Sequence, residues 1–186
     1  MRATFHALTL AVLPLALLRA DDPPQLLPVY GGAGGTSFSH DCGARHVLTG
    51  LRYRTGLVVD AVGILCRPVN ADGSLGPEST VGTISGGTGG TTGTVSCPAG
   101  KVIVLADLSY GSYVSYMALE CAPWSASLRK FTLTASTGTG LYVGAVLTPH
   151  TGEGREQCES SRQPASGIRG RAAAFVDALG LVCDEP

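Results

Sequence analysis

The chain has 186 residues, of which 26 are glycine and six are cysteine, and its formal net charge is −1. This length suits one domain with a well-formed core, and a hydrophobic share of 44% excludes a disordered chain. The 13 basic residues include only two lysines, Lys101 and Lys130, and form no stripe, which argues against nucleic-acid binding. The glycines and cysteines are therefore the features to explain.

The first twenty residues have the pattern of a secretory signal peptide. Met1 and Arg2 precede an apolar run from Ala7 to Leu18, which is shorter than the roughly 20 residues that a membrane-spanning helix needs. We therefore expect residues 1–20 to be removed on export and residues 21–186 to form a single secreted domain with no membrane span. An uncleaved anchor in the membrane interface is the alternative.

The cysteine spacing predicts three local disulfides. The six cysteines fall into three pairs with sequence separations of 24, 24 and 25 positions, namely Cys42 with Cys66, Cys97 with Cys121, and Cys158 with Cys183. Outside the cell an even set of cysteines forms disulfides, and equal spacing favours bridges within each repeat. Each bridge would close a loop of about 25 residues, worth about 3 kcal/mol in the chain-entropy account.

The segments between these cysteines repeat. The two outer segments share two motifs at one spacing: GLRYR and VDAVGILC at 50–54 and 59–66, and GIRGR and VDALGLVC at 167–171 and 176–183. The middle segment has Ser115 where the others have Asp60 and Asp177. Upstream, glycine-rich loops open the repeats, as GGAGG at 31–35, GGTGG at 86–90 and a weaker STGTG at 136–140.

Strands account for the rest of the chain. Segments rich in β-branched or aromatic residues, bounded by turn residues, lie at 47–53, 57–65, 102–108, 113–120, 131–135, 141–147 and 175–182. No dozen-residue window after residue 20 has the caps and 3.6-residue period of a helix. We predict an all-β fold, a β-prism of three four-stranded Greek-key sheets with pseudo-threefold symmetry and one disulfide per repeat. The repeats would span about 28–80, 81–130 and 131–186.

The sequence YGGAGGTSFS at 30–39, followed by RTGLVVDAVG at 54–63, resembles a repeat of the jacalin-related (β-prism I) lectins, in a griffithsin-like triple arrangement. The resemblance covers about Val29 to Cys183. It implies a sugar site in which a carboxylate accepts hydrogen bonds from vicinal hydroxyls, glycine-loop N–H groups donate to the same oxygens, and an aromatic ring supports the sugar.

In that family a glycine loop faces the acidic residue of a neighbouring repeat, and the first loop faces the last one. The resemblance therefore implies a carbohydrate-binding site that contains Gly34, Gly35, Phe175, Val176 and Asp177.

Gly56 and Asp60 are a second candidate pair, for which we expect the weak loop at 136–140 as partner. The good loop at 86–90 would then face Ser115. Val58 replaces the usual aromatic residue beside Asp60, and Phe175 replaces a tyrosine. With no complete site, we expect weak binding of mono- or oligosaccharides, of the mannose type among others.

The cysteine placement is also similar to that of vitelline membrane outer layer protein, another three-sheet β-prism. That similarity implies a non-catalytic extracellular coat or structural role. Asp60 and Asp177 would then be structural carboxylates that accept hydrogen bonds from turn N–H groups.

No pattern supports catalysis. After residue 20 the chain has three histidines, His40, His46 and His150, and it lacks the serine-hydrolase, zinc-protease and phosphate-loop motifs. No cluster of metal-ligand types occurs at a ligand spacing. We therefore expect no enzymatic activity, no cofactor and no metal.

Overall fold

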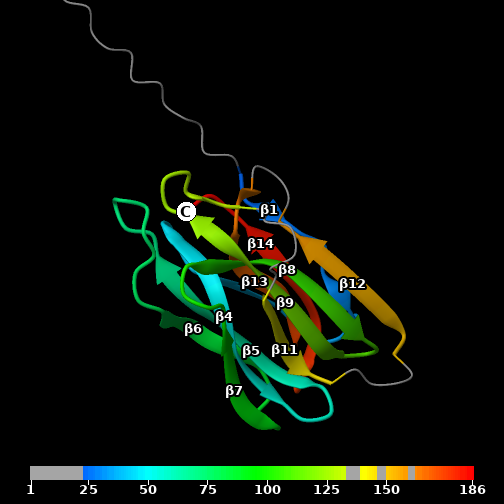
Figure 1. The fold of residues 1–186 in the computed structure, drawn as a ribbon. Helices are drawn as coiled ribbons and strands as arrows, with labels where there is room; N and C mark the ends of the chain where they lie inside the picture. Colours follow the sequence, from blue (N-terminus) through cyan, green and yellow to red (C-terminus); the bar gives the residue numbers. More distant parts are fainter. Residues whose placement is uncertain (1–22, 133–138, 146–149, 159–161) are drawn as a thin grey trace, which may run out of the picture.

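The computed structural model of the protein describes residues 23–132, 139–145, 150–158 and 162–186, so the expected signal peptide lies outside the described residues. The described chain is built from strands that form three sheets (Figure 1). It contains no helix of the length and apolar character needed to cross a membrane.

Three long hairpins form the inner strands of the sheets: β4 (His46–Thr55) with β5 (Val59–Pro68), β8 (Lys101–Tyr110) with β9 (Val114–Ser125), and β13 (Ala165–Ala172) with β14 (Val176–Cys183). Shorter strands take the outer positions: β1 (Gln25–Leu26), β2 (Tyr30–Gly31), β3 (Thr36–Asp41), β6 (Ser79–Gly86), β7 (Thr91–Ser96), β10 (Lys130–Phe131), β11 (Thr139–Gly144) and β12 (Gly152–Gln157). The inner strands are rich in β-branched and leucine residues, and β5 and β14 are buried along nearly their whole length.

Each sheet has four strand positions. The first sheet has the order β6-β5-β4-β7, and the second has β12-β8-β9 with β10 and β11 as two pieces of one edge. The third sheet has β3-β13-β14 with β1 and β2 as two pieces of its edge. The predicted all-β prism of three four-position sheets, with one disulfide per repeat, is therefore confirmed.

The outer strands of each sheet come from the sequence repeat that follows its inner hairpin. Strands β6 and β7 follow the β4–β5 hairpin and pair with it, and β10 to β12 do the same for β8 and β9. The last hairpin has no repeat after it, so β1, β2 and β3 from the beginning of the chain pair with β13 and β14. This exchange closes the three repeats into a ring.

The three predicted disulfides are confirmed, and each one crosses between two sheets. Cys42–Cys66, Cys97–Cys121 and Cys158–Cys183 are all formed and all buried. In each pair the first cysteine directly follows an outer strand and the second lies on or beside an inner strand of another sheet. The bridges therefore join the sheets pairwise around the same ring that the strand exchange closes.

The core lies between the three sheets. Its largest fully buried side chains come from all of them and include Leu48, Ile64, Ile103, Met117 and Leu179. Because inner-strand residues alternate across each sheet, every hairpin supplies apolar side chains to this shared core. No repeat could bury its apolar face alone.

A buried carboxyl group bridges the second and third sheets. Glu156, on β12, is only 2% exposed and accepts a 2.6 Å hydrogen bond through Oε2 from the backbone N–H of Leu181 on β14. That N–H faces the gap between β1 and β2, where the edge of the sheet is interrupted beside β14. Burial raises the pKa of Glu156 to about 7, although the Leu181 N–H and the charge of Arg169 act in the opposite direction.

This group makes stability depend on pH. The pKa in the folded state lies above the ordinary value of 4.5, so the native protein binds the proton more tightly than the unfolded chain does. The stabilisation from Glu156 is complete below pH 4.5 and is lost as the pH rises through about 7. The total change should be at most about 3 kcal/mol.

Glu156→Gln keeps an oxygen acceptor for Leu181 and removes the titration. Urea denaturation at fixed salt should show the variant gaining unfolding free energy relative to wild type as the pH rises from 4.5 to 7. Two parallel pH profiles would contradict this role.

Candidate functional site

The first glycine loop lies directly over Asp177. The loop at 31–35 joins β2 to β3, which flank the β13–β14 hairpin, and Gly31 pairs with Ala178. A Cβ atom at Gly34 would overlap Oδ1 of Asp177, and one at Gly35 would lie 2.5 Å from Oδ2. The structure therefore brings the expected loop and the expected carboxylate together.

The second glycine loop lies over Asp60. A Cβ atom at Gly89 would lie 2.5 Å from Oδ1 of Asp60, and one at Gly90 would lie 2.5 Å from Oδ2. Gly86 pairs with Ala61, just as Gly31 pairs with Ala178. The expected partnership between Asp60 and the loop at 136–140 is wrong, because β6 and β7 belong to the sheet of β4 and β5.

The equivalent position in the second sheet, at Ser115, does not have this site. Gly144 and Ala145 stand where Gly31 and Gly32 stand in the first loop, and Ala145 N donates to Ser115 O at 3.0 Å. The loop at 86–90 therefore does not face Ser115. The STGTG segment is also not the third loop, since Gly140 lies within β11; its residues 136–138 are outside the described residues.

Both intact loops need glycine for two reasons. The carboxylate oxygens occupy the space that a side chain would take, as described above. In addition, Gly35 and Gly90 have φ values of 66° and 65°, in the left-handed region that favours glycine. Each loop is also fixed from below, because Gly32 N and Gly87 N donate to the backbone oxygens of Asp177 and Asp60, both at 2.8 Å.

An arginine holds each intact loop from the neighbouring strand. Arg171 donates to Gly34 O at 2.7 Å and to Gly35 O at 2.8 Å. Arg54 makes the equivalent bonds to Gly89 O at 2.6 Å and to Gly90 O at 3.1 Å. These arginines alternate along their strands, which in the sequence is typical of a solvated face, so their role was not predicted.

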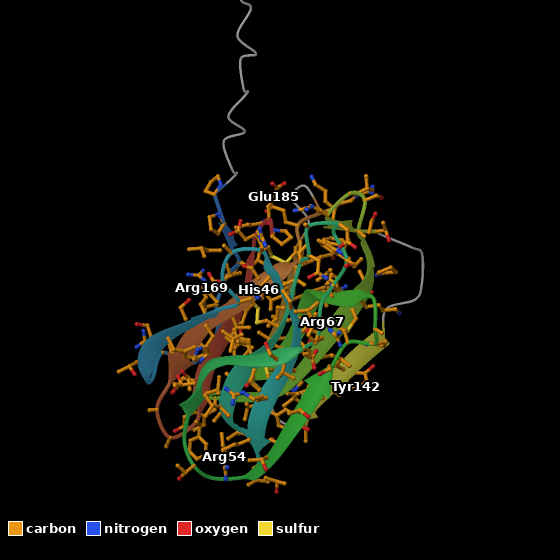
Figure 2. All side chains as sticks on the ribbon, turned by 90° about the vertical axis from the view of Figure 1, so that its left-hand side faces the viewer. His46, Arg54, Arg67, Tyr142, Arg169 and Glu185 are labelled. Carbon is orange, nitrogen blue, oxygen red and sulfur yellow. A yellow bond between two sulfur atoms is a disulfide. The ribbon has the colours of Figure 1, made fainter. Side chains whose placement is uncertain are left out.

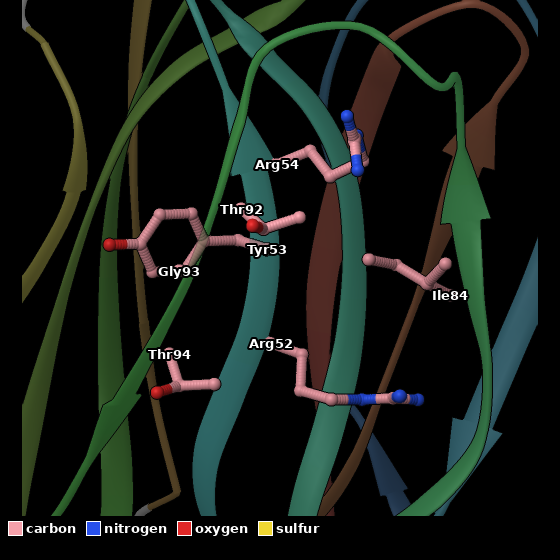
Figure 3. A pocket seen from close by; sticks show the side chains of 7 residues that line it. All are labelled: Arg52, Tyr53, Arg54, Ile84, Thr92, Gly93 and Thr94. Atoms are coloured by element: carbon pink, nitrogen blue, oxygen red, sulfur yellow. The ribbon is translucent and has the colours of Figure 1, made fainter.

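A hollow of about 410 Å³ lies beside Arg54, over the first sheet. Arg52 and Arg54 project to one side with Ile84 between them, and the β6–β7 loop arches above Arg54 (Figure 3). Arg52 lies across Gly63 and donates to Gly82 O at 3.0 Å. Both guanidinium groups therefore hold backbone of the outer strands and their loop.

The third position lacks this arginine as well. Ser109 occupies the place of Arg54 and Arg171, and the Ser115 hydroxyl donates to Ser109 O at 3.1 Å. Within the described residues this position therefore has neither the arginine nor the carboxylate, and residues 146–149, which follow Ala145, lie outside the described residues.

The two carboxylates are buried but unpaired. Asp60 is 6% exposed and Asp177 is 4% exposed, and Oδ2 of each is buried without a hydrogen-bond partner. A structural turn carboxylate would have its oxygens satisfied by backbone N–H groups. Leaving a buried charged acceptor without a donor costs about 1 to 3 kcal/mol or more. Such groups in native proteins call for an explanation, often a ligand or a catalytic role.

Apolar side chains lie in the turns that precede Asp177 and Asp60 in the chain. At the first site, Phe175 packs against Tyr113 from the second sheet, with ring centroids 4.8 Å apart. Val176, also expected in this site, is fully buried at the beginning of β14.

At the second site Leu57 is 80% exposed in the β4–β5 turn. Gly56 lies in the same turn, where a Cβ atom would be 3.6 Å from Oδ2 of Asp60. Tyr113 and Leu57 were not expected in these sites.

The polar groups of both sites can act by hydrogen bonding. Each combines a carboxylate, a backbone loop and an apolar border. Within the described part of the chain no three His, Cys, Asp or Glu side chains are close enough to hold a metal ion, and the cysteines are all in disulfides.

A double-mutant cycle tests the corrected loop pairing. Gly89→Ala should destabilise the protein by more than about 1 kcal/mol, because the new Cβ lies against the Asp60 carboxylate. In an Asp60→Ala background the same change should cost much less. The matched control is the double variant Gly89→Ala, Asp177→Ala. Its loss of unfolding free energy should equal the sum of the losses in the two single variants. If denaturation shows additive losses of unfolding free energy in both double variants, the loop at 86–90 does not contact Asp60.

Solved structures with the same architecture identify the fold. Frutapin, a lectin from Artocarpus incisa, has a TM-score of 0.63 at 11% sequence identity, over 88% of this chain and 98% of that chain. AcmJRL, a mannose-binding jacalin-related lectin from Ananas comosus, has a TM-score of 0.52 at 20% identity, over 88% and 99%. Wild-type Malaysian banana lectin gives 0.52 at 18% identity, over 88% and 100%.

No protein-family model matches the sequence, and no curated protein matches it significantly. The likeness to these lectins is therefore one of fold. The chain has the β-prism fold of the jacalin-related lectins, with glycine loops and acidic residues meeting at two of its three equivalent positions.

Proposed function

We propose that this protein is a secreted, non-enzymatic lectin that binds hexose hydroxyls at two sites, one at Asp177 and one at Asp60. The observation that supports this most is the pair of buried carboxylates whose Oδ2 atoms have no donor, each lying against a glycine pair. Vicinal sugar hydroxyls are donors of the kind these oxygens lack.

The rest of each site fits a pyranose. Glycine leaves the loop backbone without side chains, so N–H groups and carbonyls can approach sugar oxygens. Phe175 and Tyr113 at the first site offer an apolar surface to ring C–H groups, and Leu57 offers a smaller one at the second. We therefore expect the Asp177 site to bind more tightly than the Asp60 site.

Both sites lie at one end of the prism. Each acidic residue lies near the beginning of an inner strand, whereas the disulfides lie at or near the strands' other ends. In Figure 2, Arg54, beside the second loop, is at the opposite end from Glu185 near the C-terminus. Two sites on one surface would allow a branched or clustered glycan to bind with an avidity above either single affinity.

Secretion is part of the proposal. An apolar leader with a basic start and three buried disulfides fit a protein that folds in an oxidising compartment. Mannose-type glycans are our first candidates, on the family resemblance.

The alternative is a non-catalytic coat protein in which Asp60 and Asp177 are structural. Their burial favours it, since both are more than nine-tenths covered. In that case the wild-type protein would bind no glycan, and removing either carboxylate would change only the stability of the protein.

A glycan array that presents single mannose residues, probed with Asp177→Asn, Asp60→Asn and the double variant, separates these functions. Asparagine keeps the shape but replaces one acceptor oxygen with a donor group. We expect Asp177→Asn to weaken binding at least about tenfold, Asp60→Asn to weaken it less, and the double variant to lose mannose binding.

Ser115→Ala is the matched control, because its position has neither a carboxylate nor a glycine pair, and it should bind as wild type does. A wild-type signal for single mannose residues that survives in the double variant would refute these sites. Absence of a wild-type signal, with both Asn variants altered in stability, would favour the coat role.

A further inference from the structure

The outer face of the second sheet differs from the outer faces of the other two. Its strands lie in the order β11-β9-β8-β12, and four residues form a row across them, listed in strand order as Tyr142, Ala118, Asp107 and Arg155. Figure 2 shows Tyr142 on the side of the prism, away from Arg54 beside the second loop.

The tyrosines on this face lie nearly parallel. Tyr142 is 62% exposed, and its ring lies over Gly140, two residues earlier on the same strand, where a Cβ atom would overlap it. The Tyr116 ring is inclined by only 19° to it, with centroids 6.2 Å apart. A ring that covers a glycine of its own strand turns its other face to solvent, so Tyr142 offers an exposed aromatic face with the Tyr116 ring next to it.

Polar groups flank this surface. Nη1 of Arg155 donates to both oxygens of Asp107, at 3.0 and 2.8 Å, which fixes the carboxylate beside Tyr116. Asp107 separates two open hollows, one of about 320 Å³ that reaches Tyr142 and Glu120, and one of about 480 Å³ that reaches Tyr116 and Glu153. Volumes of this size suit small ligands.

An arginine stands at the equivalent position on each of the other two sheets. Asp107 pairs with Ala118, as Arg52 pairs with Gly63 and Arg169 pairs with Gly180. Arg52 and Arg169 reach the backbone oxygens of Gly82 and Leu27, at 3.0 and 2.6 Å. The short Asp107 does not reach an outer strand in this way; Arg155 holds it instead, and a hollow lies on each side of it.

We propose that this face is a further carbohydrate site, which binds two neighbouring pyranose rings of an oligosaccharide across Tyr142 and Tyr116. Aromatic ring faces pack on the apolar C–H side of a sugar, while Asp107, Arg155 and Glu120 supply acceptors and donors for its hydroxyls. The site uses no residue of the glycine loops, so it does not depend on the proposed sites at Asp177 and Asp60.

A carbohydrate fits this face better than a second copy of the chain does. Interfaces between identical subunits have apolar centres with few charges, whereas this face holds three carboxyl groups and an arginine around two tyrosines. The most exposed aliphatic side chains, Leu26, Leu57 and Leu128, are not among the residues that line its hollows.

The test uses the Asp60→Asn, Asp177→Asn double variant, in which the end sites are disabled. We expect this protein to bind linear oligosaccharides of two or more residues on a glycan array but to bind no monosaccharide. Tyr142→Ala in this background should weaken that binding about tenfold, whereas Tyr142→Phe, which keeps the ring, should weaken it less than about threefold.

Tyr142 is exposed, so its variants should unfold at the temperature of the parent, which melting curves can check. Loss of all glycan binding in the double variant, while wild type binds, would overturn the side site and leave the end sites standing. Binding unaffected by Tyr142→Ala would also overturn it. So would a dimer, seen by sedimentation, that Tyr142→Ala dissociates, because the face would then be an interface between two copies.

Discussion

The exchange of outer strands between repeats is the constraint on which the other features of this protein depend. An inner hairpin forms its sheet with strands of the next repeat, and each disulfide joins the end of an outer strand to another sheet. Backbone ladder bonds therefore fix where each glycine loop lies, whatever its side chains are. A loop meets the acidic residue of the preceding repeat, and the first loop meets the last one because the ring closes.

The three equivalent positions show that arginine, carboxylate and glycine pair act as one unit. Where Asp60 and Asp177 are present, Arg54 and Arg171 hold the loop carbonyls and the loop has glycine under the carboxylate oxygens. Where Ser115 replaces the acid, its short hydroxyl is satisfied within its own hairpin. Nothing then requires an adjacent glycine or a guanidinium, so the loss of one component removes the constraint on the others.

The sequence pattern predicted the fold and the disulfides, and the family resemblance implied the meeting of Gly34 and Gly35 with Asp177. It did not predict the partner of Asp60, although threefold symmetry, applied to the pairing of the first loop with Asp177, places the loop at 86–90 over Asp60. The third loop was misplaced because STGTG has the right composition, whereas the position of Gly144 depends on the register of β11 against β9. The loop-holding role of Arg54 and Arg171 was missed because alternating arginines on a strand also fit an exposed face.

The unpaired carboxylates of Asp60 and Asp177 depend on the structure that holds the loops over them. Each buried Oδ2 without a donor costs free energy in the unliganded state, by about 1 to 3 kcal/mol. That cost is tolerated only if the loop cannot relax away and let water in. The disulfides hold the sheets together near the ends of their strands, and the guanidinium bonds hold the loops at the other end. Disulfides at one end and guanidinium bonds at the other therefore keep each loop over its carboxylate, so the free-energy cost of the unpaired Oδ2 persists in the folded protein.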